Sequence, residues 1–151
     1  MIEHSSADPA AREVVFRQQG DPDTWVRLCD PYVPCDDDAG TGFAVELRAD
    51  GLQARVDSVE VCMWGQESPA DFLDRLVADF RGWEGERTWH TNHMALRAVF
   101  HSGGYVALTW ALAPWTTGDD VWGASLTMRL EAGEELSTLA ADLRGFLEPG
   151  S

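Results

Sequence analysis

The chain has 151 residues, of which 44% are hydrophobic and seven are Trp, and this suits one domain with a well-filled core. Its 26 Asp and Glu face only 11 Arg, with no Lys, so the formal net charge is −15. Nucleic acids and anionic membranes recruit basic patches, so this charge argues against both as partners. It favours a basic protein as partner, although acidity can also serve solubility alone.

Residues 1–11 are polar and lack periodicity, so we expect a disordered tail, followed by a single α+β domain over residues 12–148. The first residues have neither a basic start nor an apolar segment, which predicts no signal peptide. No stretch approaches the ~20 apolar residues of a membrane span. We therefore expect a cytoplasmic protein with free thiols at Cys29, Cys35 and Cys62.

Seven stretches have the short or alternating apolar pattern of strands, namely residues 13–18, 24–29, 43–50, 52–64, 94–100, 105–113 and 121–130. Residues 30–42 contain two Pro, three consecutive Asp and two Gly, which predicts a loop. Asp50-Gly51 is a strong hairpin signal. The strand after this turn changes its apolar face near Ser58, which predicts a bulge.

Two helices are predicted. The first begins at Ser68, whose side chain can accept a free amide hydrogen of the first turn, with Pro69 next. Its apolar stripe consists of Phe72, Leu73, Leu76, Val77 and Phe80. Gly82 is the predicted stop, because glycine readily takes the left-handed conformation that ends helices. The second helix covers residues 133–147 and ends before Pro149.

The fold follows from this order of elements. Connections of hairpin length imply antiparallel pairing, and each strand and helix has one apolar face. The sequence therefore predicts an α+β two-layer sandwich: a mostly antiparallel, meandering sheet of about six to seven strands, with two helices packed on one face.

Large indoles surround the bend after the first helix. We interpret this bend as the corner that locks the helix onto the sheet, a structural motif formed by Gly82, Trp83, Gly85 and Trp89. Four tryptophans fall on positions that we expect to be buried, Trp83, Trp89, Trp110 and Trp122.

The sequence contains no clear catalytic or metal-binding constellation. His90 and His93 are three residues apart, but no Cys or carboxylate pair stands nearby in a recognised zinc pattern. His101 precedes turn-forming residues and is expected at a hairpin tip. We therefore expect no metal, no cofactor and no enzymatic activity, and an enzyme acting through these histidines is the third hypothesis.

The bend also carries a resemblance. The run Asp79-Phe-Arg-Gly-Trp-Glu-Gly85, then Trp89, an alternating strand and the turn at 101–104 resembles an uncharacterised actinobacterial family of unknown function. The segment that begins at Leu130 and leads into the last helix fits this family too. More loosely, the order of elements is similar to the WapI-type immunity proteins, which neutralise a toxin delivered by neighbouring bacteria. This second resemblance implies an intracellular protein that binds a toxin domain through its surface.

Two binding functions are therefore expected. The first is a non-enzymatic acidic module that docks a basic protein such as a toxin domain. Its tentative contact residues are Asp36, Asp37, Asp38, Glu84, Glu86, Asp119 and Asp120, with Trp115 as an aromatic anchor. The alternative is a small-molecule or peptide-binding domain with a Trp-lined pocket between the sheet and the helices.

Overall fold

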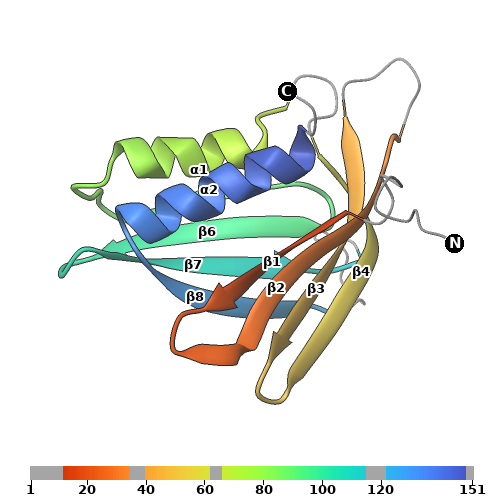
Figure 1. The fold of residues 1–151 in the computed structure, drawn as a ribbon, viewed down its shortest axis with the longest axis horizontal. Helices are drawn as coiled ribbons and strands as arrows, with labels where there is room; N and C mark the ends of the chain where they lie inside the picture. The colour runs from red at the N-terminus through yellow and green to blue at the C-terminus, as the bar shows by residue number, and fades with distance from the viewer. Residues whose placement is uncertain (1–11, 35–39, 62–65, 115–121, 149–151) are drawn as a thin grey trace, which may run out of the picture.

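The computed structural model describes residues 12–34, 40–61, 66–114 and 122–148 (Figure 1). The strands are β1 (Glu13–Gln18), β2 (Asp21–Tyr32), β3 (Thr41–Ala49), β4 (Leu52–Val61), β5 (Glu86–His90), β6 (Met94–His101), β7 (Tyr105–Leu112) and β8 (Ala124–Glu131). The helices are α1 (Pro69–Ala78) and α2 (Glu134–Leu147). The tail expected over residues 1–11 lies outside the described residues.

The strands form two antiparallel sheets of four, in the orders β1-β2-β3-β4 and β5-β6-β7-β8. The α+β class and the antiparallel pairing are confirmed, but the single sheet of six to seven strands is wrong. α1 separates β4 from β5 along the chain, and alternation within a strand does not say whether two meanders join edge to edge. β5 was not predicted, because Trp89 is the one buried residue among its five, so no alternation marks it.

The β3–β4 hairpin confirms two local predictions. Gly51 takes a φ of +77° in the tight turn between the strands, a conformation that glycine adopts readily. The bulge lies where it was expected, since Asp57 and Ser58 of β4 together oppose Ala44 of β3.

The loop expected over residues 30–42 is shorter than predicted, because β2 continues to Tyr32. A register shift between Cys29 and Tyr32 accommodates Pro31, and Asp30 takes a φ of +54° there. Proline lacks the N–H that a regular ladder needs, so the strand passes it by this irregularity.

Both sheets and both helices contribute to one hydrophobic core. Phe16 of β1 stacks on Trp110 of β7 with ring centroids 5.7 Å apart. Phe43 of β3 meets the edge of Phe146 of α2 at 5.6 Å. The two helices lie side by side over the β5–β8 sheet, with the β1–β4 sheet beside them (Figure 1). The first of these contacts joins the two sheets, and the second joins the β1–β4 sheet to α2.

α1 begins as predicted and ends early. The Ser68 side chain accepts a hydrogen bond from the Ala70 N–H at 3.0 Å. The helix ends at Ala78, four residues before the predicted stop at Gly82, because the Asp79 N–H already closes the last turn onto backbone carbonyls. Phe80 therefore lies beyond the helix and is 54% exposed, so its place in the buried stripe was a wrong prediction.

α2 is capped by a carboxylate that precedes it. Glu131 accepts hydrogen bonds from the N–H groups of Gly133, Glu134 and Glu135, at 2.9, 2.6 and 3.3 Å. The Glu135 carboxylate in turn accepts from the Glu131 N–H at 2.7 Å, a reciprocal arrangement like a capping box. The backbone hydrogen bonds, that from Gly133 first, hold the pKa of Glu131 below its ordinary value. Neither helix of the described chain is long and apolar enough to cross a membrane.

One side chain joins the edges of the two sheets. The Gln18 amide at the end of β1 donates to the Arg129 carbonyl of β8 at 3.0 Å and accepts from the Arg129 N–H at 2.7 Å. These are the two hydrogen bonds that a neighbouring strand would make with this residue. The amide therefore occupies the free edge of β8.

Candidate functional site

The outer face of the β1–β4 sheet carries a row of paired charges. Arg27 contacts Glu13 and Glu46, each at 2.7 Å. Arg55 contacts the other oxygen of Glu46 at 2.9 Å, and also Asp57 at 2.6 Å. Burial alone would raise the pKa of Glu46, but hydrogen bonds from the two arginines lower it below its ordinary value. This part of the face satisfies its own charges and has little left to offer a partner.

The neighbouring row on the same face is different. Pairing of the four strands places Arg17, Trp25, Arg48 and Gln53 beside one another in that order. Trp25 is half-buried, and both arginines are exposed. Within the described part of the chain, no carboxylate lies within ion-pair distance of Arg17 or Arg48, although the whole chain has 26 acidic residues. An indole between two unpaired guanidinium groups is thus available for contact.

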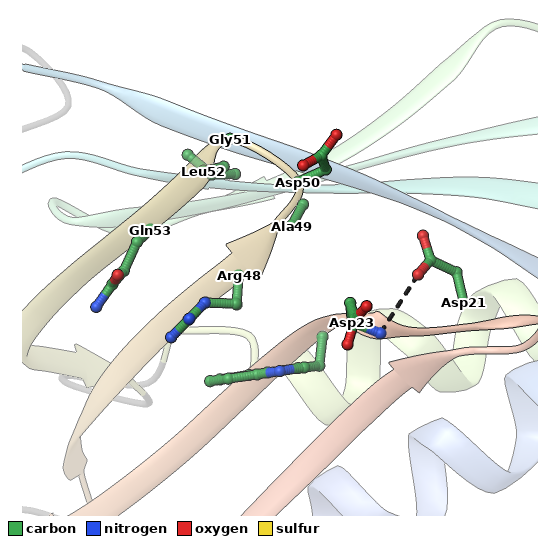
Figure 2. Close-up of a pocket in the computed structure, with 9 residues that line it drawn as sticks. Asp21, Asp23, Arg48, Ala49, Asp50, Gly51, Leu52 and Gln53 are labelled. Carbon is green, nitrogen blue, oxygen red and sulfur yellow. Dashed lines mark hydrogen bonds between the residues drawn. The ribbon is translucent and has the colours of Figure 1, made fainter.

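A hollow of about 810 Å³ opens beside this row, where the β1–β2 and β3–β4 turns come together (Figure 2). Asp21, Asp23 and Asp50 form its acidic rim, and Trp25 and Arg48 contribute to its wall. The Asp21 carboxylate is fixed in place, since it accepts hydrogen bonds from the Thr24 hydroxyl at 2.8 Å and from the Asp23 N–H at 3.3 Å. Figure 2 shows Asp21 and Asp23 on one side of the hollow, and Arg48, Asp50 and Gln53 on the other.

A smaller hollow of about 330 Å³ adjoins the first and shares Trp25, Arg48 and Gln53 with it. We name the row Arg17, Trp25 and Arg48, together with the acidic rim, the Trp25 site. This site is bounded by two depressions rather than by a flat surface. Sequence reasoning did not single out these residues. The Asp50-Gly51 turn was recognised, but its proximity to the turn between β1 and β2 depends on strand order.

Most of the predicted contact residues, Asp36, Asp37, Asp38, Trp115, Asp119 and Asp120, lie outside the described residues. The remaining two, Glu84 and Glu86, are exposed near the start of β5. Glu86 lies 3.8 Å from Arg97, so one of the two acids has an arginine beside it. The structure does not bring Glu84 and Glu86 together with the Trp25 site in any contact that it shows.

The two tryptophans of the bend after α1 are packed, whereas Glu84 and Gly85 are exposed. Trp89 is 6% exposed, and its indole N–H donates to the Glu67 carbonyl at 2.8 Å. The Trp83 indole N–H donates to the Ala98 carbonyl at 3.3 Å, and its ring meets the edge of Phe100 at 5.5 Å. Gly82 has a φ of +118° with the Phe100 ring directly against it, and Gly85 has a φ of +76°. These contacts hold the bend against β6 and against the residue that precedes the α1 cap.

Two other tryptophans, Trp110 and Trp122, were also predicted to be buried. Trp110 is fully buried, as predicted, but Trp83 is only partly buried and Trp122 is 46% exposed, so the predicted burial of Trp122 is wrong. Trp122 precedes the first residue of β8 and is therefore not held in the alternation of that strand.

The histidines do not assemble into a site. His90 is exposed at the end of β5, His93 lies in the turn that follows, and His101 stacks on Tyr105 at 4.8 Å. Among the described residues, no three His, Cys, Asp or Glu side chains lie together in a way that could hold a metal ion.

Cys29 is buried, and burial raises the pKa of its thiol. A thiol with a raised pKa is a poor nucleophile, because the reactive form is the thiolate. Cys35 and Cys62 lie outside the described residues.

Another hollow, of about 390 Å³, lies between β1, β8 and α2. Phe16, Met128 and Leu130 line its apolar side, and Glu134 and Asp142 are among its polar lining residues. It lies between sheet and helix, as the alternative prediction requires, but its lining contains no Trp.

Comparison with known protein families identifies the chain. Residues 17–150 match the model of a family of unknown function, DUF6228. The chain belongs to this family. The match includes Trp25, both sheets from the end of β1 onward, and both helices, so the DUF6228 match covers almost the whole described fold. No curated protein and no solved structure matches this DUF6228 chain.

Proposed function

We propose that this protein is a non-enzymatic binding module that docks a basic protein on the outer face of the β1–β4 sheet, at the Trp25 site. The observation that carries the proposal is the half-buried Trp25 indole between Arg17 and Arg48, which have no carboxylate partner among the described residues. Trp and Arg are the residues that most often dominate the binding energy of protein interfaces.

Charge supports a basic partner. The acidic rim of Asp21, Asp23 and Asp50 offers three carboxylates to lysine or arginine side chains, while Arg17 and Arg48 can donate hydrogen bonds to a carboxylate or a carbonyl of the same partner. The net charge of −15 would steer a basic protein toward this chain and speed association, more than it would add to affinity.

The sequence resemblances extend this proposal to the identity of the partner. An actinobacterial protein similar to the WapI-type immunity proteins would act in the cytoplasm, and its partner would be a toxin domain delivered by neighbouring bacteria.

Co-expression with toxin genes from the same genomic neighbourhood tests the proposal. A growth-inhibiting toxin should be neutralised, and calorimetry should then show direct binding. Trp25→Ala should weaken the complex at least ~30-fold, the effect of an interface hot spot of about 2 kcal/mol. Trp122→Ala is the matched control, because Trp122 is also exposed but lies outside the Trp25 site.

Two results would overturn the proposal. One is that no neighbouring toxin is neutralised or bound. The other is a bound toxin for which Trp25→Ala has no greater effect than Trp122→Ala, since the interface would then lie elsewhere.

A small-molecule or peptide ligand in the hollow between β1, β8 and α2 is the second candidate. The apolar side formed by Phe16, Met128 and Leu130 favours it, because ligand sites combine apolar walls with a few polar groups. A fragment screen by NMR should then shift amide signals of these residues. Shifts confined to the Trp25 site would reject this candidate.

A further inference from the structure

The outer face of the β5–β8 sheet is the side turned away from the core. Its residues alternate with the buried ones along each strand and include Ala95, Val99, Ala107, Ala111, Thr109 and Thr127. The residues of β6 and β7 on this face are only partly exposed, and those of β8 are exposed. Small and weakly polar side chains make up much of the face, which also carries Arg97, His101 and Tyr105, and no described segment packs on it in any contact that the structure shows.

The charges on this face differ from those of the chain as a whole. Glu86 lies at one edge, on β5, and Arg129 lies at the other edge, on β8. Arg97 is between them and approaches Glu86 at a long 3.8 Å. Arg129 lies over the Tyr105 ring at 4.0 Å and has no carboxylate within ion-pair distance among the described residues. Glu131, at the same edge, is already turned toward the amides of α2.

We propose that this face is the interface of a homodimer, with the β5–β8 sheets of two copies packed face to face. The pairing register decides the arrangement, because Glu86, Val99, Ala107 and Arg129 form one continuous row across the four strands. A two-fold axis parallel to the strands, between β6 and β7, places β5 of each copy over β8 of the other.

This symmetry brings complementary groups together. Glu86 of each copy comes to face Arg129 of the other, and Val99 comes to face Ala107. An isologous interface makes each such contact twice, so two new ion pairs form, one at each edge. Ala95 comes to face Ala111 in the same way, and Arg97 comes to face Thr109 of the other copy, so that the two sheets pack face to face over these residues.

The size of the face places the proposed dimer among small, weak interfaces. Strands of about eight residues at ~3.4 Å per residue, four abreast at ~4.8 Å, give roughly 500 Å² for each copy. The total of about 1,000 Å² is at the lower limit for a specific interface. A mostly small-residue interface of this size, between two chains that each carry −15, gives a weak and reversible dimer with a Kd in the micromolar range.

Sedimentation equilibrium at physiological salt tests the proposal through a charge swap. The wild-type protein should approach twice its 16.7 kDa mass as its concentration rises to about 500 µM, well above a micromolar Kd. Arg129→Glu alone places two carboxylates opposite each other and should weaken the dimer roughly tenfold or more. Glu86→Arg alone places two guanidinium groups opposite each other and should weaken the dimer to the same extent. The combined variant restores the pairing and should recover the dimer.

Arg81→Glu and Glu84→Arg are matched controls, because they make the same changes of charge at exposed positions outside the face. Recovery in the combined variant also separates a lost interface from a lost fold. A monomeric wild-type protein over the whole concentration range would overturn the proposal. A dimer that neither single swap weakens would overturn it too, because another face would then form the contact. The Trp25 site is on the other sheet, so either proposal can fail without the other.

Discussion

Replacing Gly82 by Ala tests whether packing fixes the bend after α1. Gly82 has a φ of +118°, and an added Cβ would lie 2.9 Å from two atoms of the Phe100 ring. A side chain at positive φ costs about 1–2 kcal/mol, and displacing a packed, partly buried ring costs about 1–2 kcal/mol more. We therefore expect Gly82→Ala to lower the free energy of unfolding by about 3 kcal/mol. At ~2–4 °C per kcal/mol for a chain of this size, Tm falls by roughly 6–12 °C.

Gly85→Ala provides the matched control within the same bend. Gly85 also has a positive φ, +76°, but an added Cβ would meet no atom within 4 Å. Only the backbone penalty of about 1 kcal/mol then applies. Urea unfolding of both variants, followed by tryptophan fluorescence and far-UV circular dichroism, measures the difference. If Gly82→Ala costs no more than Gly85→Ala, the contact with Phe100 does not stabilise the bend and the packing argument is wrong.

Two further predictions concern the ends of the sheets. Gln18→Ala removes both hydrogen bonds to Arg129 and should lower the free energy of unfolding by about 1–2 kcal/mol. The control Gln19→Ala should change it by less than about 0.5 kcal/mol. Equal effects of the two variants in urea unfolding would contradict the bridging role of Gln18. The pKa of Glu131 is lowered in the folded protein, so its contribution to stability is present above its ordinary pKa of 4.5 and is lost as the pH falls through the lower, folded value. The difference in Tm between wild type and Glu131→Gln should therefore shrink as the pH falls below 4.5, and a difference that stays constant down to pH 2 would refute the capping role.

Local patterns predicted most of the fold because each strand buries one face. In β7, Val106, Leu108, Trp110 and Leu112 are buried in strict alternation, and this strand was predicted almost to the residue. β5 has no such pattern, since its five residues supply one buried side chain. The division into two sheets could not be predicted, because it depends on whether β4 and β5 pair, and no property of either strand alone decides that.

The candidate site was less accessible to prediction than the fold. Trp25 could be placed in a strand, but Arg17 and Arg48 become its neighbours only through the register of three strands. Asp50 was correctly predicted in a hairpin turn, whereas Asp21 and Asp23 lie within β2, and the proximity of the three residues is a tertiary fact. Glu84 and Glu86 were chosen for their charge alone, and charge without spatial context did not reveal the arginine near Glu86.

The contact between Phe43 and Phe146 has a consequence for synthesis of the chain on the ribosome. β1–β4 emerge first and can pair with one another as successive hairpins, since every strand of this sheet neighbours the next in sequence. The apolar face of this nascent sheet, however, is completed by the last turn of α2, which emerges only after all eight strands. Until then Phe43, Val45 and Leu47 lack part of their final cover. A ribosome stalled before α2 would therefore hold a paired sheet with exposed apolar surface, the kind of intermediate that chaperones bind.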